Sequence, residues 1–234
     1  LQDVGALVEA PSLYGHLTGR ENLEVTAQMH GGLPEAALDR ALDLVDLRDA
    51  AHQRVRTYSL GMKQRLGLAL ALVHDPDLLI LDEPTNGLDP AGMQDVRTLL
   101  RDLPERANVT VFLSTHLLGE VERIASHVGV IRKGRLVFQG ATGDLTARQP
   151  TYVVIGTDEP TEARRVLQRD AGMECLPEPD SGGRLRVRPG TSETAARCAA
   201  LLIEAGLAVH HLRVHRPSLE DGFLALTAPD TAAA

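Results

Sequence analysis

The chain has 234 residues, of which 43% are hydrophobic, and its formal net charge is −8. This composition suffices for one large or two small packed domains, whereas the acidic balance argues against a nucleic-acid-binding protein, and no apolar run is long enough to predict a transmembrane helix. The two cysteines, Cys175 and Cys198, are too few and too far apart in sequence to predict a disulfide framework or a zinc site, so we expect reduced thiols.

The first 146 residues alternate short apolar runs with amphipathic segments, which is typical of an α/β domain. Thr18 and Glu21 have the spacing of a capping box, so a helix is predicted to begin there. The run at 78–81 is apolar throughout, as expected of a strand buried on both faces of a parallel sheet. Other strands are predicted at 3–9 and 109–113, further helices after Pro34, from Ser59 to about His74, at 92–103 and at 118–127, and a hairpin at 128–139.

From residue 151 the pattern changes to strand, helix, two strands, helix and strand. This β-α-β-β-α-β order is consistent with a small ferredoxin-like α+β unit. The strands are predicted at 152–155, 173–176, 184–188 and 208–215, and the helices at 161–170 and 192–205. We therefore expect two domains, 1–146 and 151–226, with the boundary near Pro150. Arg184, Arg186 and Arg188 alternate with apolar residues, which favours a strand with one solvated face.

Polar side chains follow two of the buried strands in the first domain. Asp82 and Glu83 end the strand at 78–81, and His116 follows the strand at 109–113. In an open α/β sheet, ligands bind beyond the carboxyl ends of the strands, so these groups are expected to meet at one rim. This constellation suits phosphoryl transfer, with Asp82 holding Mg²⁺, Glu83 as the general base toward water, and His116 contacting the γ-phosphate. Ser59, at the start of its helix, is expected to form an anion site.

Each of these residues also has a simpler interpretation. A carboxylate pair after an apolar strand is often a solvated turn, and Ser59 alone is most simply an N-cap. Taken together, in this order and with these spacings, they favour the functional interpretation over several coincidences.

The ordered set resembles the signature, Walker B and D-loop motifs of ATP-binding-cassette (ABC) ATPases. Segment 58–65 reads Tyr-Ser-Leu-Gly-Met-Lys-Gln-Arg, where the family signature begins Leu-Ser-Gly-Gly-Gln, so Ser59 and Gly61 carry over. Segment 77–83 ends in Leu-Asp-Glu, and segment 87–90 reads Gly-Leu-Asp-Pro, with Asp89 in the D-loop. Glu9 stands at the Q-loop position. This glutamate, the altered signature and the ending Pro-Ser-Leu-Glu-Asp-Gly-Phe-Leu at 217–224 resemble the bacitracin- and daunorubicin-exporter branch.

The resemblance implies a P-loop NTPase fold with a helical subdomain and a role as the ATP-hydrolysing subunit of an exporter. It implies ATP and Mg²⁺ as cofactors, with Ser59, Gly61, Asp82, Glu9 and Asp89 at the nucleotide and with Asp82 and Glu9 near the metal. It further implies a cytoplasmic protein, peripheral on the inner face of the cell membrane. Its partners would be a membrane-spanning permease and a second ATPase subunit, with Ser59 contacting the nucleotide of that subunit and Asp89 at the dimer interface.

No Gly-x-x-x-x-Gly-Lys-Ser/Thr phosphate-binding loop occurs in the sequence, which begins at Leu1. We therefore expect that the N-terminal part of the ATPase domain is missing and that the chain alone binds ATP poorly. The alternative is a truncated or degenerate subunit that binds its partners without turning over ATP. A soluble ABC protein of translation or repair is disfavoured, since the sequence has no second cassette.

The segment from Glu9 to Leu17 is expected to couple nucleotide state to the membrane partner. Pro11 interrupts regular structure there, which would leave Leu13 and Tyr14 available to a second protein. The simpler interpretation is an ordinary strand-to-helix connection whose apolar residues fill the core.

Overall fold

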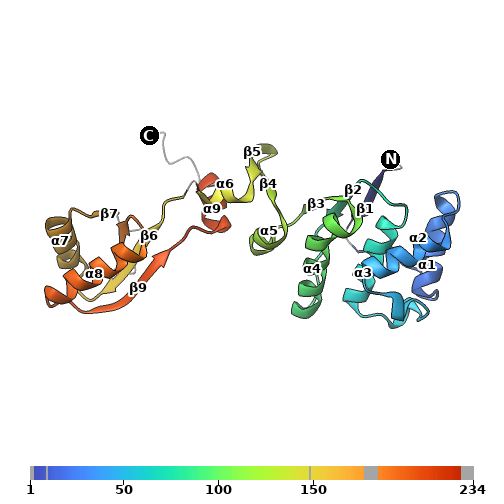
Figure 1. The fold of residues 1–234 in the computed structure, drawn as a ribbon, viewed down its shortest axis with the longest axis horizontal. Helices are drawn as coiled ribbons and strands as arrows, with labels where there is room; N and C mark the ends of the chain where they lie inside the picture. The colour runs from blue at the N-terminus through green and yellow to red at the C-terminus, as the bar shows by residue number, and fades with distance from the viewer. Residues whose placement is uncertain (1–2, 9, 148, 177–183, 228–234) are drawn as a thin grey trace. The chain divides into compact units, whose positions relative to one another are not determined.

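The structure is a computed structural model that describes residues 3–8, 10–147, 149–176 and 184–227 (Figure 1). The chain divides into two compact units, 1–126 and 127–234, and each has its own hydrophobic core. The hairpin predicted at 128–139 therefore groups with the second unit. None of the helices in these described ranges is long and apolar enough to cross a membrane.

The first unit is built on a three-stranded parallel sheet in the order β1-β2-β3 (Figure 1). The strands are β1 (Val4–Val8), β2 (Leu78–Asp82) and β3 (Thr110–Ser114). Their register aligns Val8 with Asp82 and Asp82 with Ser114, so the carboxyl ends of all three strands lie at one rim. This is the arrangement that the sequence predicts for the polar residues following β2 and β3.

One face of this sheet packs on the helices of the first unit. Leu79 and Leu81 are fully buried there, in a core that they share with residues of α3 and α4. The opposite face is open in the described structure: Ile80 is 38% exposed, Phe112 64% and Val8 68%. The prediction that strand 78–81 is buried on both faces is therefore wrong, because the described helices cover only one side of the sheet.

Five α-helices belong to the described part of the first unit. Thr18 and Glu21 form the predicted capping box, in which the Glu21 amide donates to the Thr18 hydroxyl and the Thr18 amide donates to the Glu21 carboxylate. The helices are α1 (Gly19–Met29), α2 (Glu35–Leu44), α3 (Leu60–Leu72), α4 (Pro90–Ala107) and α5 (Leu118–Ile124), with short 3₁₀ turns η1 (Arg48–Ala50) and η2 (Val55–Thr57).

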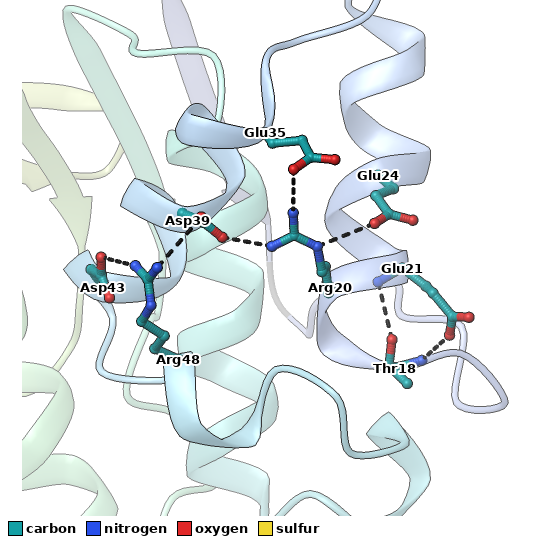
Figure 2. Close-up of polar contacts among 8 residues, drawn as sticks. All are labelled: Thr18, Arg20, Glu21, Glu24, Glu35, Asp39, Asp43 and Arg48. Atoms are coloured by element: carbon teal, nitrogen blue, oxygen red, sulfur yellow. Dashed lines mark hydrogen bonds and ion pairs between the residues drawn. The ribbon is translucent and has the colours of Figure 1, made fainter.

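Ion pairs join α1, α2 and η1 (Figure 2). Arg20 of α1 lies 2.6 Å from Asp39 of α2 and 3.4 Å from Glu24, while Arg48 of η1 reaches Asp39 from the other side at 3.4 Å. The hydrogen bond from Arg20 lowers the pKa of Asp39 below its usual value. Shared use of one carboxylate by two guanidinium groups fixes the helices relative to one another.

The second unit begins with an antiparallel hairpin, β4 (His127–Arg132) and β5 (Arg135–Ala141). The second unit also has two helices that the sequence patterns do not predict. They are α6 (Thr142–Ala147), directly after the hairpin, and α9 (Leu219–Thr227), after the last strand. These helices pack on each other: a Cβ added to Gly222 would lie only 2.9 Å from Leu145. Each is short, and its apolar residues are buried by a partner distant in sequence, so local periodicity does not reveal it.

The rest of the second unit is a four-stranded antiparallel sheet in the order β7-β8-β6-β9 (Figure 1). The strands are β6 (Tyr152–Thr157), β7 (Glu174–Leu176), β8 (Arg184–Arg188) and β9 (Val209–His215). Helices α7 (Pro160–Ala171) and α8 (Ser192–Glu204) follow β6 and β8, and their apolar residues form one core with those of the sheet. The predicted ferredoxin-like order is confirmed.

Candidate functional site

Two carboxylates lie where β2 ends. Asp82 is the last residue of the strand and accepts a hydrogen bond from the Ser114 hydroxyl, directly opposite on β3. Glu83 continues the ladder, since its amide donates to the Ser114 carbonyl at 3.1 Å, but its φ is +47°. A left-handed conformation is costly for a residue with a side chain and concentrates at functional sites. The backbone therefore turns sharply at the residue that the sequence predicts as the general base.

Glu83 and His116 form a pair across the rim. One oxygen of Glu83, Oε1, accepts the His116 backbone N–H at 3.1 Å and lies 2.8 Å from Nδ1 of the same residue. The other oxygen, Oε2, is buried and has no hydrogen-bond partner. The imidazole is 67% exposed, whereas the carboxylate is 27% exposed. One oxygen of the carboxylate is thus held in place while the second keeps its acceptor capacity for another donor.

Two oxygen groups at the rim could contribute ligands to a hard divalent cation, although the described residues include no group of three or more His, Cys, Asp or Glu side chains that could hold a metal ion. Mg²⁺ prefers carboxylate, hydroxyl and water oxygens, and Asp82 together with the Ser114 hydroxyl offers that donor set. Glu83, which follows Asp82 in the sequence, adds the unpartnered oxygen Oε2. Glu9, the other predicted metal-site residue, lies outside the described residues, although Val8 before it is in register with Asp82.

A second group of predicted residues lies at the start of α3 and α4. Ser59 caps α3 by accepting from the Met62 amide at 3.2 Å, and Asp89 caps α4 by accepting from the Gly92 amide at 2.8 Å. The two helix starts are adjacent, because a Cβ built on Gly61 would lie 3.7 Å from the Gly92 Cα.

Ser59 and Asp89 are exposed, and no hydrogen bond or ion pair joins either to Glu83 or His116 in the described residues. The predicted residues therefore form two groups, one at the sheet rim and one at the paired helix starts.

In the segment before α1 that is expected to contact the membrane partner, one of the two candidate side chains is exposed and the other is partly buried. Tyr14 is 53% exposed, and its amide donates to the Asn22 side chain at 2.9 Å. Leu13, by contrast, is partly buried and packs against the core of the first unit. The expectation that both side chains are available to a partner is wrong for Leu13, because its neighbours in the fold already cover much of it.

Behind the rim lies a polar network that the sequence patterns do not reveal. Glu120 of α5 is only 3% exposed; its Oε2 accepts from the Thr85 hydroxyl at 2.6 Å and its Oε1 from Arg97 of α4 at 2.9 Å. Thr85 stands two residues after Glu83, and α5 begins two residues after His116. The network therefore ties the loop after Glu83 and the helix after His116 to α4. A glutamate in a short amphipathic helix carries no signal of its burial, so only the tertiary structure shows this role.

The sequence is similar to those of known ABC transporter proteins. A family model described as ABC transporter matches residues 1–86. The bacitracin transport ATP-binding protein BcrA of Bacillus licheniformis is 37% identical over 226 residues, which are 97% of this chain and 73% of that protein. The lantibiotic transport ATP-binding protein SrtF of Streptococcus pyogenes is 40% identical over 139 residues, or 59% of this chain and 60% of that protein.

Among solved structures, cbiO1 from Clostridium perfringens, described as part of the ABC transporter complex cbiONQ, has a TM-score of 0.58 and 26% identity. The match covers 72% of this chain and 64% of that one, so this chain spans less than two thirds of the solved protein. The fold is therefore that of ABC ATPase subunits. The sequence match to BcrA, at 37% identity over 97% of this chain, shows membership of the family as well as a shared fold. By these relations the chain belongs to the family of ABC transporter ATP-binding proteins.

Proposed function

We propose that this chain is the ATP-binding and ATP-hydrolysing part of an ABC exporter for antibiotic-type compounds. The observation that carries the proposal is the Glu83–His116 pair beside Asp82 at the sheet rim. The names of the relatives, for bacitracin and lantibiotic transport, support the substrate class.

In the proposed reaction Glu83 accepts the proton of the attacking water. Oε1 is occupied by His116, so Oε2 is the oxygen left to receive that proton. Asp82 and Ser114 would hold Mg²⁺, which when bound neutralises negative charge on the nucleotide phosphates. The strained backbone at Glu83 and the buried network of Glu120 keep the base in place.

The pairing also refines the role predicted for His116. A carboxylate only accepts hydrogen bonds, so the 2.8 Å contact assigns a proton to His116 Nδ1. A neutral ring then has a bare Nε2, which cannot donate to a phosphate oxygen. Contact between His116 and the γ-phosphate therefore requires the doubly protonated ring. In either state the ring orients Glu83, and this orienting role is the one that the geometry supports best.

The group at the helix starts suits contact with a second ATPase subunit. The starts of α3 and α4 lie side by side and carry Ser59, Gly61 and Asp89, which take no part in the contacts at the rim. Free N–H groups at two adjacent helix starts favour an anion such as a nucleotide phosphate. We assign these residues to the nucleotide held by the partner subunit, with Glu9 near the metal. The permease partner and the place on the inner face of the cell membrane follow from the exporter role.

A second candidate is a subunit that binds partners without turnover. The 234 residues of this sequence contain no Gly-x-x-x-x-Gly-Lys-Ser/Thr loop. Such a loop supplies the backbone N–H groups that cradle the β- and γ-phosphates. On either proposal this chain alone should show no appreciable Mg²⁺-dependent ATP hydrolysis, and purified chain that turns over ATP in a Glu83-dependent manner would contradict the role given to the missing loop.

The proposals separate in a polypeptide that joins residues 3–227 to the phosphate-binding segment of a relative. Hydrolysis is expected there, and Glu83→Gln should lower kcat by about 10²- to 10⁴-fold, as loss of a general base does, while ATP still binds. Glu105→Gln, at an exposed position of α4, is the matched control. An inactive joined protein that still binds the permease would favour the second candidate. Loss of ATP binding together with turnover would remove Glu83 from the role of base.

The coupling role of the segment before α1 is tested at Tyr14 alone. Leu13 is excluded because its substitution would disturb the core. In a complex with the permease, Tyr14→Asp should reduce transport while basal ATP hydrolysis stays within about twofold, as expected of an exposed side chain. Normal transport by this variant would end the coupling proposal.

A further inference from the structure

The sheet of the second unit has one face that its helices do not cover. Buried Val153, Leu185 and Val187 point toward α7 and α8 and form the core with them. Successive side chains of a strand alternate between faces, so the residues between these belong to the opposite face. The register groups them in two rows: Arg186, Val154 and Arg213 in one, and Arg188, Tyr152 and His215 in the next. We call these six residues the arginine face.

Positive charge on this face is poorly compensated. Arg186 and Arg213 have no ion pair among the described residues, and Arg188 has only Glu174, at 3.6 Å. The Nε atoms of Arg186 and Arg188 are buried and have no hydrogen-bond partner. Residues 127–234 hold equal numbers of acidic and basic residues, 13 of each, so this is a local concentration rather than a basic domain. Buried, unpaired N–H donors amid like charges are unfavourable unless an anion satisfies them.

The aromatic rings beside these arginines are already engaged. The Arg186 guanidinium lies 4.9 Å from the Tyr152 ring centroid, and Tyr152 stacks on His215 with centroids 4.5 Å apart. His215 in turn lies 3.3 Å from Asp221. These contacts hold Arg186 in place before any ligand arrives. They also occupy the aromatic surface that a nucleobase would need for stacking.

We propose that the arginine face binds a small soluble ligand through its phosphate groups, with Arg186 and Arg213 as the principal contacts. These residues flank Val154 in one row, so their Cα atoms lie about 10 Å apart, two strand spacings. Both long side chains can reach a phosphate placed over Val154, and the guanidinium fork matches phosphate oxygens in pairs. Sequence alone favours a solvated strand face here. The cross-strand register and the unpaired Nε atoms are what point to a ligand.

Two other anionic partners fit the face less well. Nucleic acids and anionic membranes present many charges over a wide area, and residues 127–234 carry no net formal charge to attract them. The large apolar side chains exposed in the described structure include none of the arginine face, so a membrane would gain no apolar contact there. A small anion meets only the local charge.

The test uses the full chain and inorganic tripolyphosphate without magnesium, at low salt. Calorimetry measures the affinity, and NMR follows the Nε–H signals of the arginines. Arg186→Gln/Arg213→Gln should weaken binding at least about tenfold, since charge-assisted hydrogen bonds are lost. The control Arg165→Gln/Arg197→Gln removes the same charge from the helices on the other side of the sheet and should change affinity less than twofold.

Three results would overturn the proposal: no binding by the wild-type chain, equal weakening by the two double variants, or tighter binding to single-stranded RNA or to phosphatidylserine vesicles than to tripolyphosphate. Amide exchange of β6 and β8 checks that Arg186→Gln/Arg213→Gln keeps its fold. If it does not, the single variant Arg213→Gln, at an exposed edge-strand position, should still weaken binding, and an unchanged affinity there would also count against the site.

Discussion

The parallel sheet β1-β2-β3 and the antiparallel sheet β7-β8-β6-β9 use their polar residues in different places. In the first, Asp82, Ser114 and Glu83 lie at one end of the strands, and the strands themselves are apolar. In the second, the charged residues lie along the strands, and one whole face carries arginines.

The difference follows from how each sheet is connected. Parallel strands all end at the same rim, so residues far apart in sequence, such as Glu83 and His116, meet there. Antiparallel strands leave alternate residues on one uncovered face, so charge spreads over an area. The first arrangement makes a small site with fixed geometry, and the second makes a surface. If this difference holds, each unit should depend on its own features and respond separately to changes in them.

The largest effect is expected at Glu120. Glu120→Ala leaves Arg97 and Thr85 without their buried partner and should lower the free energy of unfolding of the first unit by about 4 kcal/mol. Denaturant unfolding followed by hydrogen exchange resolves the two units. Glu105→Ala, exposed on α4, should cost less than about 0.5 kcal/mol. Equal loss of protection in peptides of 184–215 would show that the units do not unfold separately.

A somewhat smaller effect is expected at Gly5. Strand β1 approaches α3 so closely that a Cβ on Gly5 would lie 2.1 Å from the Ala71 carbonyl oxygen. Gly5→Ala should therefore destabilise the first unit by about 2–3 kcal/mol through overpacking. Gly119→Ala places its Cβ in open space within α5 and should be neutral or slightly stabilising. A neutral Gly5→Ala would mean that β1 and α3 are not packed as described.

Acid should weaken the first unit through His74. Burial, and the charge of His30 stacked on it at 4.4 Å, lower the pKa of His74 below its usual value of 6.5. The folded state therefore disfavours the protonated ring, and this unit loses stability as the pH falls through 6.5 toward the lower folded-state pKa. Thermal melts between pH 8 and 5.5 measure the loss. His74→Gln should flatten the slope, whereas His52→Gln, at an exposed position, should keep it.

Alkali should act on the second unit. Burial raises the pKa of the Cys198 thiol to about 11, from a usual value of 9.0. Above pH 9 the unfolded chain ionises this thiol and the folded chain does not, so stability falls between pH 9 and 11. Hydrogen exchange of the α8 amides at pH 8 and pH 10 measures this loss of stability. Cys198→Ala should reduce this pH dependence, and Cys175→Ala/Cys198→Ala should remove it, because burial also raises the pKa of the Cys175 thiol. A slope that persists in the double variant would assign it to another group.

Much of the fold was predictable because its signals are local. The capping box at Thr18 and Glu21, the apolar strands before Asp82 and Ser114, and the β-α-β-β-α-β order after residue 151 depend on residues a few positions apart. The candidates for the rim were likewise identified from sequence, since a polar residue directly after an apolar strand marks the end of that strand.

Other features arise only when distant segments meet. Helices α6 and α9 are too short to produce a recognisable periodic pattern in the sequence, and they pack on each other. The burial of Glu120 depends on Thr85 and Arg97, which lie 35 and 23 residues away. Sequence order determined which chemical groups this protein has at its strand ends. The tertiary structure decided that one oxygen of Glu83 is held by His116 and the other left unpaired, and that arginines from two strands flank Val154, because burial and hydrogen bonding depend on neighbours in space.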